Sequence, residues 1–279
     1  MEKILVTTDQ SANSKAAIRF AIALAKQRKA QLTVLHVYHL LKPFKWTEQQ
    51  FAAYTEEFCQ KTTSELTAFV AKIYHELKEP DMDYQLVLVS NMDVVEGIIT
   101  YASQQGYAYI CISTRGAGAV RKLFGTHTAK LISSSPVPVI SVPRGYRLTP
   151  VKEVLYAADM TDYEVELKKV ADFARPLHAT VSMVHISYPY ELLWDKAVAE
   201  DTLRKKANYD INLLTPPRDL VNALMEDLEL IIKKRKPSLL VLFTHQTRSL
   251  FDKLFLPSNA ETYSFHGKIP MLTYKKEHQ

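Results

Sequence analysis

A glycine-rich segment between residues 113 and 126 is the part of the sequence best suited to bind an anion. Gly116, Gly118 and Gly125 are three of only seven glycines in the chain. Glycine lets main-chain N–H groups approach a ligand with no side chain in the way. A helix that begins at Thr126 would also direct its free N–H groups and positive dipole end toward a phosphate. The pattern predicts a phosphate site, and the alternative is a mobile loop with a solvated basic edge.

Two charged groups could complete such a site. Arg115, within the segment, would supply counter-charge to a phosphate. Asp9 ends the first expected strand, and its carboxylate could accept a hydrogen bond from a ribose hydroxyl or an adenine amino group. The alternative is that Asp9 starts the next helix together with Ser11 and Asn13, as a cap that contributes about 1 kcal/mol. Position in the sequence leaves both interpretations of Asp9 open.

An internal repeat indicates how these residues are positioned. Four segments return later in the chain in the same order: 4–9 as 154–159, 30–37 as 179–186, 122–124 as 253–255, and 137–140 as 269–272. Four such matches in order predict two domains, residues 1–146 and 151–279. Pro143, Gly145 and Pro150 punctuate the boundary between them.

Within both copies, short apolar runs alternate with longer helical patterns. The expected strands are 3–8, 31–37, 84–89, 108–113 and 137–142, then 152–157, 180–186, 210–214, 238–243 and 269–274. The expected helices of the first copy are 13–28, 48–78, 93–105 and 126–134. This alternation predicts an α/β fold with two tandem, doubly wound, Rossmann-like parallel sheets. Ligands of such sheets bind beyond the carboxyl ends of the strands, where Asp9 and the glycine-rich segment both fall.

Composition excludes several classes of protein. Hydrophobic residues make up 47% of the chain and charged residues 23%, which is typical of a globular protein. The net charge of +5 is not gathered into a patch, so we expect no nucleic-acid partner. Two cysteines fit a reduced cytoplasmic protein. We find no secretory leader and no apolar run of about 18 residues, so we expect no membrane partner.

With these motifs in view, the chain resembles a tandem universal stress protein. The resemblance is carried by residues 4–9, 35–37, 114–126 and 136–139 and extends over both copies. It implies adenine nucleotide alpha hydrolase-like domains that pair as a pseudo-dimer. It also implies a stress-response module whose first domain binds ATP or a related adenine nucleotide, with Mg²⁺ accompanying the nucleotide.

The ATP-binding branch of that family carries G-x-x-G, nine residues, then G-[S/T]. By match, Asp9 and Val37 would flank the adenine and ribose. Gly116, Gly125 and Thr126 would hold the phosphates, and His127 and Thr128 would add hydrogen-bond donors at the helix start. The expected binding site also includes Ser113, Arg115 and Gly118.

The sequence departs from the family pattern at three places. Ser113 replaces the first glycine, and its Cβ stands where a close backbone approach is wanted. Eight residues, not nine, separate Gly116 from Gly125, although Gly118 to Gly125 keeps the usual local spacing. Thr7 replaces a proline that is common after the first strand. These departures leave a second hypothesis open, a nucleotide-free interaction scaffold of the same fold.

The second copy lacks the features of a phosphate site. No glycine lies between Pro237 and His266, and its first helix is expected to open with a capping box formed by Thr161 and Glu164. We therefore expect this copy to serve as the structural partner of the first. The resemblance implies that strands 137–142 and 269–274 pair within the chain, and two chains could also form a homodimer.

No catalytic or metal-binding constellation stands out. His36 and His185 end equivalent strands, where metal ligation would need further ligands and a hydrogen-bonded, half-buried histidine is the simpler interpretation. Phosphoryl transfer requires a metal-holding carboxylate and a base or water-positioning group, and only Asp9 can be named. We therefore expect a binding protein rather than an enzyme, with slow ATP hydrolysis left open.

Overall fold

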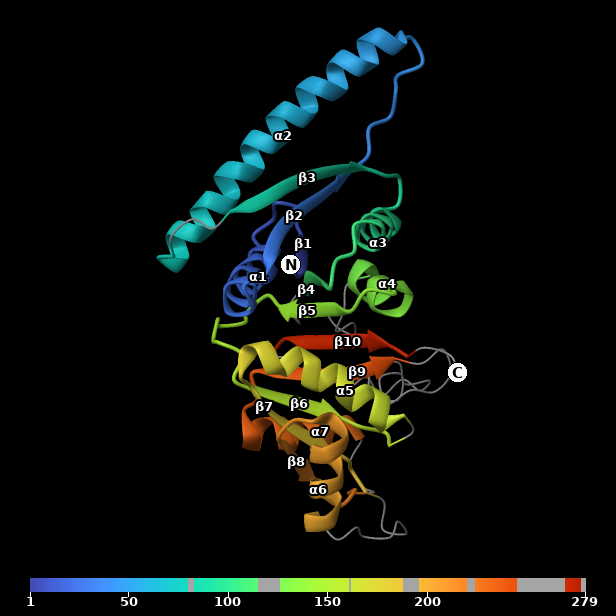
Figure 1. Ribbon diagram of the computed structural model, residues 1–279. Helices are drawn as coiled ribbons and strands as arrows, with labels where there is room; N and C mark the ends of the chain where they lie inside the picture. Colours follow the sequence, from blue (N-terminus) through green and yellow to red (C-terminus); the bar gives the residue numbers. More distant parts are fainter. Residues whose placement is uncertain are drawn as a thin grey trace. The chain divides into compact units, whose positions relative to one another are not determined.

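The computed structural model describes residues 1–79, 83–114, 126–160, 162–187, 196–219, 224–244 and 269–276. The chain divides between Arg144 and Gly145 into two compact units. Figure 1 labels the helices and strands of both units, and each unit is described by itself.

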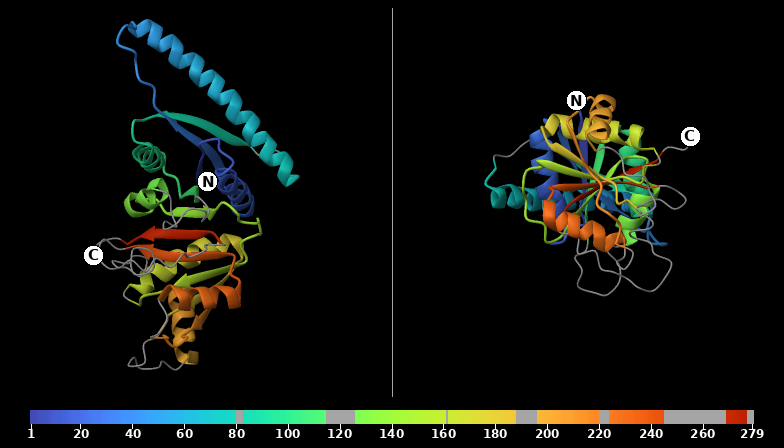
Figure 2. Two further views of the ribbon diagram at one scale, coloured as in Figure 1. Left: turned by 180° about the vertical axis from the view of Figure 1, so that it is seen from behind. Right: turned by 90° about the horizontal axis from the view of Figure 1, so that it is seen from below.

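The first unit is a parallel sheet with helices on both faces. Its strands are β1 (Lys3–Thr7), β2 (Gln31–Tyr38), β3 (Tyr84–Ser90), β4 (Tyr109–Thr114) and β5 (Val139–Pro143), in the order β3-β2-β1-β4-β5. Its helices are α1 (Lys15–Arg28), α2 (Glu48–Leu77), α3 (Val94–Gln104) and α4 (Thr126–Ser134). α1 and α2 cover one face, and α3 and α4 cover the other (Figure 2). Because β1 lies between β2 and β4, the strand order reverses at β1.

The core of this unit explains why α1 lies so close to the sheet. Ile4, Leu5 and Val6 of β1 are fully buried, as expected for a strand covered on both faces. α1 presents small residues, including Ala17 and Ala21, together with the buried ring of Phe20. Burial of a side chain such as Phe20 contributes about 1.5–3 kcal/mol. The small residues let the helix axis approach, and the large ones fill the space between them.

The second unit repeats this arrangement. Its strands are β6 (Glu153–Ala157), β7 (Thr180–Val184), β8 (Ile211–Leu214), β9 (Leu239–Thr244) and β10 (Met271–Lys275), in the order β8-β7-β6-β9-β10. Its described helices are α5 (Tyr163–Ala174), the 3-10 turn at Arg175–Leu177, α6 (Lys196–Ala207) and α7 (Leu224–Arg235). The predicted α/β fold with doubly wound parallel sheets is thus confirmed. The predicted pairing of 137–142 with 269–274 joins the two units and stays a prediction.

The expected capping box in the second unit is wrong. α5 begins at Tyr163, so Asp162 is the residue that precedes the helix, and its side chain makes no capping hydrogen bond. Glu164 therefore stands one position too early for a capping box and instead pairs with Lys206 of α6. Thr161 lies outside the described residues.

Among the helices that the described ranges contain, none is long and apolar enough to cross a membrane.

α3 lies close to the carboxyl end of β2, and Gly97 is the residue of α3 at this close approach. Asp93 caps the helix by accepting hydrogen bonds from the N–H groups of Val95 and Glu96 at 2.9 and 3.1 Å. A Cβ on Gly97 would lie 2.9 Å from the Cβ of Asn91 and 3.1 Å from a methyl group of Val37. Glycine at this position lets α3 approach the strand.

Replacement of Gly97 by alanine tests this close approach. Alanine favours a helix by up to about 1 kcal/mol over glycine, but the added methyl group has no room unless α3 moves. We expect the Gly97→Ala protein to lose roughly 1–3 kcal/mol of unfolding free energy, as overpacked cores do. Chemical denaturation measures the change, with Gly145→Ala, where a Cβ meets open space, as the control. A Gly97→Ala protein as stable as the wild type would show that α3 does not need this contact.

Candidate functional site

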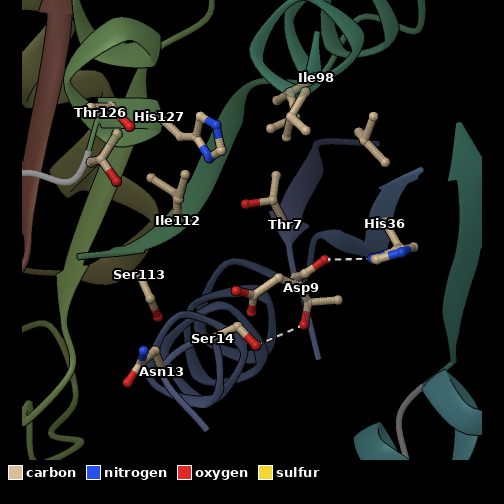
Figure 3. A pocket seen from close by; sticks show the side chains of 14 residues that line it. Thr7, Asp9, Asn13, Ser14, His36, Ile98, Ile112, Ser113, Thr126 and His127 are labelled. Carbon is tan, nitrogen blue, oxygen red and sulfur yellow. Dashed lines mark hydrogen bonds between the residues drawn. The ribbon is translucent and has the colours of Figure 1, made fainter. Parts of the chain in front are cut away.

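A cavity of about 280 Å³ opens at the carboxyl ends of the strands around β1. Its lining includes six of the predicted binding residues: Asp9, Val37, Ser113, Thr126, His127 and Thr128. Figure 3 shows Thr126 and His127 on the α4 side of the opening and Asp9 on the β1 side. The other predicted residues, Arg115, Gly116, Gly118 and Gly125, lie outside the described residues. The structure therefore brings together residues that are more than 100 positions apart in the sequence.

Asp9 is held in a tight turn directly after β1. Gln10 adopts a left-handed conformation with φ of 60°, and the Ser11 N–H donates to Oδ1 of Asp9 at 3.0 Å. Partial desolvation would raise the pKa of Asp9, but hydrogen bonds from Ser11 outweigh it, so the pKa is lowered from its ordinary value. The side chain is exposed and charged at neutral pH, and no lysine or arginine among the described residues pairs with it. It is an acceptor available to a ligand.

The alternative role for Asp9, as part of the start of α1, is only partly correct. Ser11 does bond the N–H of Asn13, at 3.2 Å, but the helix begins later, at Lys15. Ser14 precedes α1 and makes no capping bond, because its hydroxyl lies 2.8 Å from the hydroxyl of Thr8. Asp9 thus fixes the turn that leads to the helix and does not cap it.

Ser113 of β4, the strand next to β1, supplies a cap to α1. Its hydroxyl accepts a hydrogen bond from the Ala17 N–H at 2.9 Å, which satisfies one of the donors left free at a helix start. The serine that replaces a family glycine is thus engaged with α1. The sequence did not predict this bond to α1, because no local signal connects residues that are 96 positions apart.

Among the described residues, the start of α4 is the feature suited to an anion. Thr126 and His127 are exposed and Thr128 is buried. The first N–H groups of a helix lack intrahelical partners and carry the positive end of its dipole. Lys130, one turn later, pairs with Asp93 and so links α4 to α3. The helix start is therefore held in place beside the cavity.

An apolar wall faces these polar groups. It consists of Val37 from β2, Val94 and Ile98 from α3, and Ile112 from β4. Of these four residues the sequence predicted only Val37, because the contribution of α3 depends on the close approach at Gly97. A flat apolar ring would fit such a wall, with its polar edge directed toward Asp9.

His36 and His185 are hydrogen-bonded and half-buried, as expected from the simpler interpretation of their positions. Nδ1 of His36 lies 2.9 Å from the carbonyl oxygen of Thr8, and Nδ1 of His185 lies 3.4 Å from that of Ala158. Both rings are half-buried. Within the described ranges, no group of three histidine, cysteine or acidic side chains could hold a metal ion.

The equivalent position of the second unit is filled by an ionic cluster. Asp159, the counterpart of Asp9, lies 3.1 Å from the ammonium group of Lys276, which follows β10. The same ammonium group pairs with Glu166 at 2.8 Å and with Asp162 at 3.6 Å. Tyr156 donates a hydrogen bond to Glu166, whose pKa is raised because burial disfavours its charge. In the second unit Lys276 thus pairs with Asp159, whereas no described lysine or arginine pairs with Asp9 in the first unit.

Loss of the Lys276 ammonium group would leave the buried carboxylate of Glu166 without a counter-ion. The side chains of Lys276 and Glu166 are only 5% and 4% exposed. We expect Lys276→Ala to cost about 3–5 kcal/mol of unfolding free energy, the usual effect of breaking a buried pair from one side. Lys275→Ala, at the adjacent position, should change it by less than about 0.5 kcal/mol. Equal effects of the two substitutions in urea denaturation would contradict the assigned role of Lys276.

Comparisons with known proteins agree with this architecture. The model of the universal stress protein family matches residues 1–143. Universal stress protein YxiE of Bacillus subtilis (strain 168) is 25% identical over 144 residues, which is 50% of this chain and 97% of that protein.

Solved structures extend the likeness in fold over both units. A universal stress protein from Archaeoglobus fulgidus DSM 4304 is similar with a TM-score of 0.71 and 16% identity, over 98% of each chain. A putative universal stress protein from Pseudomonas aeruginosa UCBPP-PA14 matches with a TM-score of 0.54 and 15% identity, over 99% of this chain and 93% of that one. Since the family model spans half of the sequence, this chain belongs to the universal stress protein family.

Proposed function

We propose that the first unit binds ATP or a related adenine nucleotide in the cavity beside β1 and that the second unit does not. The single observation that supports this most is the convergence of an ionised acceptor, an apolar wall and a helix start on one cavity at the reversal of strand order. Such reversals are where doubly wound sheets bind their ligands.

Each part of a nucleotide has a matching feature. The adenine ring would lie against Val37 and Ile98, with its amino group or the ribose hydroxyls donating to Asp9. The phosphates would extend toward the N–H groups at Thr126 and toward the glycine-rich segment. The cavity volume of about 280 Å³ is close to the lower end of the roughly 300–1,000 Å³ of small-molecule sites. It suits a base and sugar, with the phosphates outside.

The proposed role is binding without efficient catalysis. Phosphoryl transfer depends on carboxylates that hold Mg²⁺ and on a group that positions the nucleophile. Asp9 is the only acidic side chain among the described residues that line the cavity, and the proposal assigns it to the base and sugar. Mg²⁺ would therefore be carried by the phosphates of the nucleotide. Membership of the family supports the proposed stress-response role. Slow hydrolysis would appear as ADP in a long incubation with ATP.

Nucleotide binding can be tested by thermal unfolding of the full chain with ATP and Mg²⁺. A ligand at 100 times its Kd adds about 2.7 kcal/mol of stability, so Tm should rise by roughly 5–10 °C. Gly125→Asp should abolish the rise, because it puts a like charge where the phosphate would lie. Gln246→Ala, in the corresponding segment of the second copy, is the control and should keep the rise. A wild-type protein with no shift, and with no adenine compound released by acid, would support the nucleotide-free scaffold instead.

The role of Asp9 can be separated from the phosphate site with Asp9→Asn. The amide oxygen can still accept from the Ser11 N–H, so the turn should survive. We expect the Kd for adenosine and for ATP to rise by about tenfold or more, because a hydrogen bond to a charged acceptor is lost. Asp172→Asn, an exposed site on α5, is the matched control for the charge change. An unchanged Kd for Asp9→Asn by calorimetry would remove Asp9 from the site.

A further inference from the structure

The outer edge of the first unit's sheet lacks the usual protection against pairing with another strand. β3 ends the strand order of this unit, and β2 is its only neighbour among the described residues. Its seven residues, Tyr84–Ser90, read YQLVLVS and contain no charge, no proline and no glycine. Natural edge strands are normally short, charged, bulged or interrupted by proline, because an open edge presents unpaired N–H and C=O groups.

The corresponding edge of the second unit shows what protection looks like in the same chain. β8 has four residues, Ile211–Leu214, and two prolines follow it closely at positions 216 and 217. A strand so short and so terminated offers little to a partner. The contrast indicates that the open edge at β3 is specific to the first unit.

A second feature, independent of the strand, lies on the same side of the unit. The fully buried residues of α2 begin at Thr62, and before them Phe58 and Cys59 contact the sheet, both through Tyr38 at the end of β2. Its first half extends past β3, away from the rest of the sheet (Figure 1). We call residues 39–61, the loop before α2 and this first half, the arm. No residue of the arm is buried.

The arm carries apolar side chains that water surrounds. Leu41 is 76% exposed, and Phe44 is fully exposed. Tyr54 is 42% exposed and contacts Trp46, with ring centres 5.2 Å apart. Tyr38 and Phe58 form a second aromatic pair, with ring centres also 5.2 Å apart. The first pair holds the loop onto α2, and the second holds α2 to the end of β2. The arm thus has a defined surface without a described partner.

We propose that β3 and the arm form the interface of a homodimer in which the β3 strands of two copies pair antiparallel about a two-fold axis. An uncharged edge is complementary to itself, since its free donors and acceptors match those of an identical strand in reverse. Only an axis through Val87 pairs all seven residues, which sets Leu86 opposite Leu88 of the second copy. Because the arm extends past the edge, it reaches across onto the partner.

The size of this surface agrees with a stable dimer. β3 and the arm together offer about 30 residues, against the roughly 20–30 residues a side of a standard interface. The proposal concerns a different face from the nucleotide cavity and does not depend on ligand binding.

The mass of the full chain in solution tests the proposal. Light scattering over a concentration series should give twice the chain's 31.8 kDa. Val87→Lys sets two like charges face to face at the axis and should raise the dimer Kd at least about a hundredfold. Phe44→Ser should raise it by about tenfold through the arm. Asn212→Lys on β8 carries the same new charge on the other edge and should leave the dimer intact.

A cross-link fixes the register of the pairing. In a Cys59→Ser background, Val87→Cys should form a disulfide between two copies, because residues opposite each other at the axis are close enough to bond. Asn212→Cys should not cross-link. A monomer throughout the concentration series would overturn the proposal, and a strand from another protein would then be the candidate partner of β3. A dimer that survives Val87→Lys and forms no cross-link through Val87→Cys would also overturn the proposal.

Discussion

The functional features of this chain depend on the reversal of strand order at β1. β1 pairs with β2 on one side and with β4 on the other, all three parallel. Their carboxyl ends must therefore meet at one edge, and the connections from β1 and β4 leave in opposite directions. That constraint alone brings Asp9 and the start of α4 to a common cavity. The nucleotide site proposed for the first unit depends on β1 and β4 keeping their register.

The two units share one architecture but differ in the residues that follow the first strand of each sheet. In the first, the carboxylate after the first strand is exposed and has no described counter-ion. In the second, Lys276 occupies that position and pairs with three carboxylates. Phe243 fills the place that corresponds to Ser113 and stacks on Tyr274, with ring centres 5.0 Å apart. In the second unit these groups thus contact one another where the first unit has an exposed carboxylate.

The sequence predicted the fold well because its signals are local. Strand and helix boundaries agree to within about two residues along most of the described chain, since apolar runs and helical periodicity depend on neighbouring residues. The convergence of Asp9, Val37 and Thr126 was also predictable, because parallel strands share one carboxyl edge.

What the sequence could not predict depends on side chains that meet across the fold. The capping of α1 by Ser113 and the ionic cluster at Lys276 join residues far apart in the chain. The capping box at Thr161 failed because α5 begins slightly later than the motif suggests. The apolar wall from α3 escaped notice because it depends on how closely Gly97 lets that helix approach.

The most direct measurement is a crystal structure of the full chain grown with an adenine nucleotide. The account predicts one nucleotide per chain, with the base against Val37 and Ile98, a polar contact to Asp9, and phosphate oxygens at the N–H groups that begin α4. A cavity beside β1 filled by side chains of the protein itself, or a nucleotide bound at Asp159 in the second unit, would contradict it.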